Sequence, residues 1–188
     1  MDESTALLLI DVQQGFDDPR WGERNNPEAE RNLARLLAAW RQAGAPVIYV
    51  QHLSERHDSP LRPGQPGAEL KAEVQPQPTE PLFQKRVNSA FIGTALETHL
   101  RQRGVRRLVI GGLTTDHCVS TTVRMAANLG FVVMVVADGT ATFERYGHDG
   151  RHYSAEEVHR LALASLHGEF ATVLDTDAAL AAVGAPAT

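Results

Sequence analysis

Three residues of this 188-residue chain carry side chains suited to acyl transfer, and each follows or ends a short apolar segment. Cys118 is the single cysteine, Asp11 follows the apolar run 7–10, and Lys85 is one of two lysines among 18 basic residues. A thiolate is a nucleophile, a partly desolvated carboxylate has a raised pKa suited to proton transfer, and an ammonium stabilises nearby negative charge. Together these side chains predict nucleophilic catalysis, provided that folding gathers them.

Each of the three also has a plain structural interpretation. An isolated cysteine can be a small buried hydrophobe, a strand-ending aspartate can be a cap, and a rare lysine can be an accident of an arginine-rich composition. The surroundings of Cys118 favour a functional role, because Gly111-Gly112 form a turn and Thr114 or Thr115 can cap a helix that starts just before the cysteine. A thiol in a first helical turn is expected to ionise easily.

Apolar segments of two lengths alternate along the chain, which indicates strands connected by helices. The short, nearly continuous runs predict strands buried on both faces. In the clearest helical segment, 26–44, we expect Asn26 to cap the helix, Pro27 to begin it and Gly44 to end it. The six expected strands are 6–10, 46–50, 82–84, 107–110, 131–137 and 170–174, and two further helices are expected before Gly104 and Gly168.

This alternation predicts one domain over residues 1–188, an α/β fold with a doubly wound, six-stranded, mainly parallel sheet between two helical layers. Ligands of such sheets bind beyond the carboxyl ends of the strands. The proline-rich stretch 53–81 is expected to be a long surface loop, which is often functional, for example as a lid. The polar and aromatic segment 143–153 suits either a substrate cover or an ordinary loop. His159 and His167 are expected to be packing or surface residues.

Composition and charge argue against several classes of protein. Hydrophobic residues make up 43% of the chain, and the formal net charge of -5 leaves no basic excess for nucleic acid or an anionic bilayer. The longest apolar run, 131–137, is far shorter than the roughly 20 residues of a membrane-spanning helix. No targeting pattern is visible, so a cytoplasmic location is expected. A single cysteine cannot form an intramolecular disulfide.

Three motifs, in this order and spacing, strongly resemble the isochorismatase-like cysteine hydrolases. They are LLLIDVQ at 7–13, KRVNSAF at 85–91 and GLTTDHCV at 112–119, and the resemblance covers nearly the whole chain. It implies a Rossmann-like sheet that carries a triad of Asp11, Lys85 and Cys118. It also implies an oxyanion hole formed by the backbone N–H groups of Thr114 and Cys118, with a cis peptide between Leu113 and Thr114.

The resemblance implies a hydrolase that cleaves a carbon–nitrogen bond of a small amide, lactam or carbamoyl compound. Cys118 attacks the carbonyl, Asp11 protonates the departing amine, and water then releases the acid from a thioester. The alternative is a non-hydrolytic small-molecule binder or redox sensor on the same fold. Arg20 or Arg145 could hold a substrate carboxylate. Residues near the expected strand ends that are predicted to bind substrate are Phe16, Trp21, Asn88, Phe91, Thr115 and His117, although the aromatic ones could belong to the core.

Departures from the family's branches narrow the substrate. Nicotinamidases carry an Asp-x-His pair that helps bind a metal, but Val50 stands in place of the aspartate, and His52 and His57 alone make a weak site. We therefore expect no metal or other cofactor and disfavour nicotinamide. Isochorismatases that cleave an enol ether lack the cysteine, so Cys118 argues against that reaction.

Other substrates of similar enzymes stay open, namely N-carbamoyl compounds, ureides, maleamate and the streptothricin lactam. Segment 16–22 and Asn25-Asn26 look most like the streptothricin-hydrolase-like branch. Related proteins assemble as dimers or tetramers, so a homo-oligomer is expected, without nucleic-acid or membrane partners.

Overall fold

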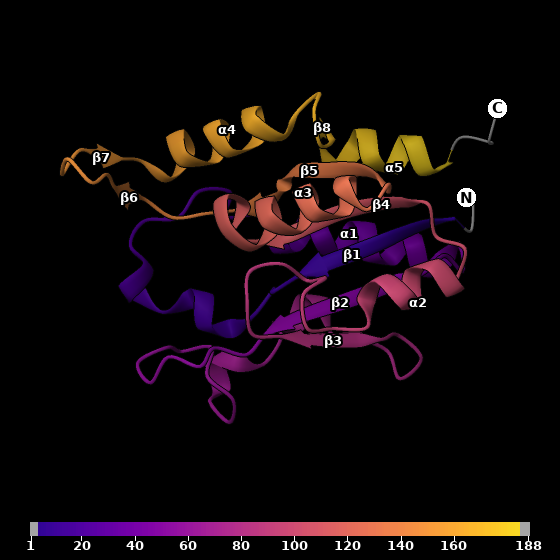
Figure 1. Ribbon diagram of the computed structural model, residues 1–188, viewed down its shortest axis with the longest axis horizontal. Coiled ribbons are helices and arrows are strands. Elements are labelled where there is room, and N and C mark those ends of the chain that lie inside the picture. The colour runs from indigo at the N-terminus through magenta and orange to yellow at the C-terminus, as the bar shows by residue number, and fades with distance from the viewer. Residues whose placement is uncertain (1–3, 185–188) are drawn as a thin grey trace.

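Helices cover both faces of a six-stranded sheet in the computed structural model, which describes residues 4–184 (Figure 1). The strands are β1 (Thr5–Ile10), β2 (Val47–His52), β3 (Leu82–Lys85), β4 (Arg107–Leu113), β5 (Val132–Ala141) and β8 (Thr172–Leu174). All are parallel and lie in the order β3-β2-β1-β4-β5-β8. The chain thus reverses its direction of growth between β1 and β4, which is where such sheets bind ligands. The predicted doubly wound α/β fold is confirmed.

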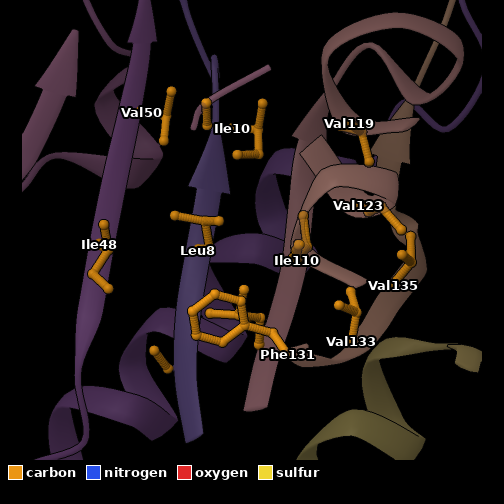
Figure 2. Packing of buried hydrophobic residues seen from close by; sticks show 14 of the residues in the cluster. Leu8, Ile10, Ile48, Val50, Ile110, Val119, Val123, Phe131, Val133 and Val135 are labelled. Atoms are coloured by element: carbon orange, nitrogen blue, oxygen red, sulfur yellow. The ribbon is translucent and has the colours of Figure 1, made fainter. Parts of the chain in front are cut away.

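The two faces of the sheet have separate cores because side chains along a strand alternate between faces. Leu7 and Leu9 of β1 pack with α1 (Ala29–Gln42) and α5 (Thr176–Gly184). Leu8 and Ile10 pack on the opposite face with α2 (Leu96–Gln102), α3 (Ser120–Asn128) and α4 (Ala155–Leu166). Figure 2 shows part of this second core, including Leu8 of β1, Ile110 of β4 and Val123 of α3. Burial on both faces explains the nearly continuous apolar runs.

All six predicted strands are present, but β4 and β5 extend beyond their apolar runs. Gly112 and Leu113 of β4 pair with Thr140 and Ala141 of β5, after a register shift that begins at Ile110. A Cβ atom at Gly112, whose φ is +130°, would collide with the carbonyl oxygen of Ile10. Glycine therefore lets β4 approach β1 closely at the edge where the candidate site lies.

The first helix begins later than predicted, at Ala29, and Asn26 and Pro27 lie outside it. Asn26 has a φ of +44°, and its side-chain amide donates to the carbonyls of Ala137 and Thr140 at 2.9 and 2.7 Å. The expected cap is wrong because this amide instead ties the start of α1 to β5. Gly44 follows the helix with a φ of +65°, which agrees with the predicted left-handed ending.

Segment 53–81 is less of a free surface loop than predicted. The side-chain amides of Gln13 and Gln51 both donate to the carbonyl of Ala68 at 2.7 Å, and Leu61 and Val74 are buried. Its central part is therefore anchored to the sheet, which does not suit a freely moving lid.

Segment 143–153 contains a short antiparallel hairpin that was not predicted, formed by β6 (Arg145–Tyr146) and β7 (His152–Tyr153). It projects at the end of the molecule toward which the β1 arrow points in Figure 1. In the described part of the chain, no helix combines the length and the apolar character needed to cross a bilayer.

Candidate active site

The ammonium of Lys85 joins the sequence-predicted residues at the carboxyl edge of the sheet. Its Nζ donates to Oδ2 of Asp11 at 2.6 Å and to Sγ of Cys118 at 3.2 Å. A third contact, also 3.2 Å long, joins Nζ to Nδ1 of His52. Asp11 is fully buried, Lys85 is 1% exposed and Cys118 is 8% exposed. Folding thus brings together three residues that are distant in sequence.

Strand order explains why a lysine occupies the centre of this site. Lys85 ends β3, His52 ends the neighbouring β2, and Asp11 follows β1 on the far side of β2. The long side chain of Lys85 crosses the end of β2 to reach Asp11. The backbone of Asp11 has a φ of +51°, and its N–H donates to the carbonyl of Val50 at 2.9 Å. This bond fixes Asp11 to β2 directly past the strand end.

Cys118 lies in a π-helical turn, Thr115–Val119, between β4 and α3. The carbonyl of Thr114 accepts the N–H groups of His117 and Val119, each at 3.1 Å, and the peptide between Leu113 and Thr114 is cis. Thr114 occupies the N-cap position of this turn, as expected, but its side chain makes no capping hydrogen bond, and Thr115 contacts Nδ1 of His159 at 2.9 Å. Cys118 therefore lies in a first helical turn, which is of the π type and leads into α3.

The thiol of Cys118 is harder to ionise than the sequence suggested. Burial is the largest influence and raises its pKa, the charge of Asp11 acts in the same direction, and Lys85 opposes both. Burial also raises the pKa of Asp11, again against the effect of Lys85. These influences disfavour the thiolate that the sequence suggested, because the desolvation of Cys118 outweighs its single nearby cation.

Asp11 has one carboxylate oxygen available for proton transfer. Oδ2 accepts from Lys85, whereas Oδ1 is buried without a hydrogen-bond partner among the described residues. A carboxylate oxygen of Asp11 lies within 4.8 Å of Sγ of Cys118. The thiol also approaches Oδ1 of Asn88 at 3.8 Å, which is a weak contact. The arrangement can therefore pass a proton from sulfur to carboxylate while Lys85 stays beside the sulfur.

The same groups could be mistaken for a metal site. Donor atoms of Asp11, His52 and Cys118 all lie within 4.8 Å of one another. However, Nζ of Lys85 contacts each of the three side chains and occupies the position of a cation between them. These donors are not free to ligate an ion while Lys85 stays in place.

Phe16 and Trp21, both predicted to bind substrate, form an aromatic cluster with Phe143. The ring centroids are 5.4 Å apart for Phe16–Trp21 and 5.9 Å apart for Trp21–Phe143. Phe16 is buried in this cluster, whereas Trp21 also lines a cavity of about 290 Å³. The cavity lining comprises Arg20, Trp21, His52, Ser54, Arg56, Asp58, Ser59, Pro60 and Leu61, so His52 connects it to the Lys85 contacts.

The other four predicted binding residues are more scattered. Asn88 is exposed beside Cys118, and Phe91 stacks on Phe131 of the core at a centroid distance of 6.0 Å. Thr115 is buried against His159, so that histidine has a packing position, as expected. His117 is exposed and lies 3.4 Å from Oδ2 of Asp116.

The arginines considered for a substrate carboxylate already face acidic side chains of the protein. Nε of Arg20 lies 3.0 Å from Oδ1 of Asp18, and Nε of Arg145 lies 3.0 Å from Oδ2 of Asp116. Sequence reasoning also missed the part of His52 in the site, having treated it only as a weak metal ligand. The available signal was its position two residues past the predicted strand 46–50, since Asp11 and Lys85 also lie just past their own predicted strands.

Comparison with known proteins identifies the family of this chain. The isochorismatase domain model matches residues 5–178, and the chain belongs to the isochorismatase family. The family protein YrdC of Bacillus subtilis is 47% identical over 94% of this chain and 95% of its own length. The crystal structure of a putative isochorismatase-family hydrolase from Chromobacterium violaceum superposes with a TM-score of 0.94 at 49% identity, covering 97% of this chain and 95% of that one.

Two further relatives carry the names of enzymes. Streptothricin hydrolase of Streptomyces noursei is 37% identical over 74% of this chain, which spans only 50% of that protein. Nicotinamidase 3 of Arabidopsis thaliana is 31% identical over 92% of this chain and 85% of its own length. The resemblance inferred from three short motifs is therefore confirmed at the level of the family.

Proposed function

We propose that this protein is a cysteine hydrolase that cleaves a carbon–nitrogen bond of a small molecule through a thioester on Cys118. The observation that carries the proposal is the buried ammonium of Lys85, bonded at once to the carboxylate of Asp11 and the sulfur of Cys118. Membership of the isochorismatase family supports hydrolysis, and the relatives named nicotinamidase and streptothricin hydrolase support an amide or lactam substrate.

The first step forms the thioester. Asp11 accepts the thiol proton on its unpaired Oδ1, and its raised pKa makes it a stronger base than an ordinary carboxylate. The sulfur attacks the carbonyl carbon while Lys85 stabilises its negative charge. The backbone N–H groups of Thr114 and Cys118 stabilise the oxyanion. Asp11 then gives the proton to the departing nitrogen, the carbon–nitrogen bond breaks, and the amine or ammonia leaves.

The second step regenerates the enzyme. Asp11, again a carboxylate, takes a proton from a water molecule that attacks the thioester carbonyl. The carbon–sulfur bond breaks, the acid is released, and the proton on Asp11 returns to the sulfur. Because the thiol is buried and burial raises its pKa, it does not have the exposed, low-pKa character typical of redox-sensing cysteines. Hydrolysis is therefore favoured over redox sensing.

The cavity beside His52 indicates the kind of substrate. Its volume of about 290 Å³ suits a small molecule, and Trp21, Pro60 and Leu61 give it an apolar side. Arg20 and Arg56 also line it, but they are paired with Asp18 and Asp58, respectively. Each of these two exposed arginines already has an acidic partner in the chain. We therefore propose an uncharged, partly apolar amide that contacts Trp21 and reaches Cys118 beside Asn88.

The test is to trap the acyl-enzyme. The protein is incubated with a library of small amides, lactams and ureides, quenched within seconds and analysed by intact-mass spectrometry. We expect an acyl adduct on Cys118, the only cysteine, together with released amine or ammonia. Cys118→Ala should give neither product, because no other thiol is present. Hydrolysis at the wild-type rate in that variant would contradict the mechanism.

A further inference from the structure

We infer that His52 is a positioning residue whose ring nitrogen Nδ1 holds the ammonium of Lys85 in place against Asp11 and Cys118. The effect of this contact on catalysis rests on the proposed function, whereas the contact between His52 and Lys85 does not depend on it. His52 belongs to none of the three motifs that carry the resemblance, and its distinguishing feature is its contact with Lys85.

The ammonium of Lys85 has three N–H bonds, and the site offers three acceptors. They are Oδ2 of Asp11 at 2.6 Å, Sγ of Cys118 at 3.2 Å and Nδ1 of His52 at 3.2 Å. Because the side chain of Lys85 is fully buried, an N–H bond left without an acceptor would disfavour the charged form. His52 therefore supplies the third acceptor that contacts the ammonium of Lys85.

The backbone of His52 is locked in register with Asp11. His52 pairs with Lys85 across β2 and β3, which places the two side chains next to each other. The side chain of Gln13, two residues beyond Asp11, accepts the N–H of His52 at 2.9 Å and donates to its carbonyl at 3.0 Å. Through Gln13, the ring that holds Lys85 is fixed relative to the carboxylate that Lys85 must reach.

The surroundings of His52 keep Nδ1 free to accept. Burial is the largest influence and lowers the pKa of His52, and the charge of Lys85 lowers it further, against the opposing charge of Asp11. The thiol of Cys118 also faces the ring, and Arg20, Arg56 and Asp58 line the adjoining cavity with it. The ring is consequently neutral at pH 7. A hydrogen bond between His52 and the backbone of Val87 acts in the opposite direction, without reversing the lowered pKa.

The experiment compares His52→Asn with His52→Leu. Asparagine retains an acceptor close to the position of Nδ1, whereas leucine retains bulk without an acceptor. The readout is the rate of Cys118 alkylation by iodoacetamide as a function of pH, followed by intact mass, because this chain has one cysteine. His57→Leu is the matched control, since His57 is exposed in the loop that follows.

We expect His52→Leu to lower the alkylation rate at pH 7.5 about tenfold and to move the thiol profile to higher pH, since the thiolate loses a well-held cation. His52→Asn should stay within about threefold of wild type, and His57→Leu should be unchanged. A wild-type profile in His52→Leu, or an Asn variant as slow as the Leu variant, would overturn the inference.

Alkylation requires no substrate, so the result holds whether or not any amide is cleaved. If His52→Leu does not fold, ¹⁵N NMR of the wild-type imidazole decides instead. We expect a neutral ring with unprotonated Nδ1 at pH 7. A protonated Nδ1 would exclude the acceptor role.

Discussion

The two lysines of this chain are both buried beside carboxylates, but the carboxylates differ in how many of their oxygens are hydrogen-bonded. Lys71 contacts Oδ1 of Asp17 at 2.5 Å and Oε1 of Glu30 at 2.7 Å. Glu30 also accepts two hydrogen bonds from Arg24, each at 2.7 Å, so both of its oxygens are in use. At Lys85, by contrast, the carboxylate of Asp11 keeps one buried oxygen without a partner.

This difference in pairing moves the two carboxyl pKa values in opposite directions. Burial alone would raise the pKa of Glu30 and is the largest influence on it, but Arg24 and Lys71 together lower it to about 2. Burial raises the pKa of Asp11, and Lys85 does not reverse the shift. A buried carboxylate with saturated pairing holds the fold together, whereas one with an unused oxygen can move a proton.

The largest expected effect is on turnover in Asp11→Asn. An amide can still accept a hydrogen bond from Lys85, but it cannot take the thiol proton. We expect turnover to fall about 10²- to 10⁴-fold, measured as amine release with the substrate found by the trapping experiment. Asp17→Asn, beside the other lysine, is the matched control and should keep nearly full activity. A fast Asp11→Asn enzyme would remove the functional distinction between the two sites.

Next in size is the loss of stability expected for Glu30→Gln. The folded pKa of Glu30 lies below its ordinary value of 4.5, at about 2. Its contribution is therefore fully present above pH 4.5 and is lost as the pH falls toward 2. A shift of this size corresponds to about 3 kcal/mol in the free energy of unfolding. The contribution of Asp11 to stability changes with pH in the opposite direction. Its pKa is raised, so the stability that it contributes is present at low pH and is lost as the pH rises.

Urea unfolding at a series of pH values measures this contribution. The difference between wild type and Glu30→Gln should be largest above pH 4.5 and should shrink below it, with turnover per folded molecule nearly unchanged. Glu28→Gln, which removes an exposed partner of Arg31 on the same helical turn, should change stability by less than about 0.5 kcal/mol. A pH-independent loss in Glu30→Gln would show that its charge is not what stabilises the Lys71 site.

The smallest expected effect is that of Asn88→Ala. Its Oδ1 lies 3.8 Å from Sγ of Cys118, and a thiol is a weak donor, so little orientation energy is lost. We expect the rate of acyl-enzyme formation to fall about threefold, without a change in the melting temperature. A loss comparable to that of Asp11→Asn would make Asn88 part of the proton-transfer machinery. Stopped-flow measurement of the first turnover distinguishes the two outcomes.

Local sequence patterns predicted much of the fold. The runs that became β1 and β5 are apolar because both faces of the sheet are covered, and Asp11 marked the end of β1. The start of α1 was misjudged because Asn26 has the chemistry of a cap but bonds to carbonyls of β5 more than 100 residues away. Such a competing partner leaves no trace in the sequence around residue 26.

The sequence by itself determined which side chains near strand ends could do chemistry, because short apolar runs indicate where the strands lie and parallel strands share one carboxyl edge. Only the tertiary structure decided the pKa values, hydrogen bonds and neighbours of those side chains. The raised pKa of Cys118, the unused oxygen of Asp11 and the place of His52 beside Lys85 all depend on neighbours from separate strands. Burial and hydrogen bonding are sums over groups in space, so a pKa at this site is a property of the folded chain.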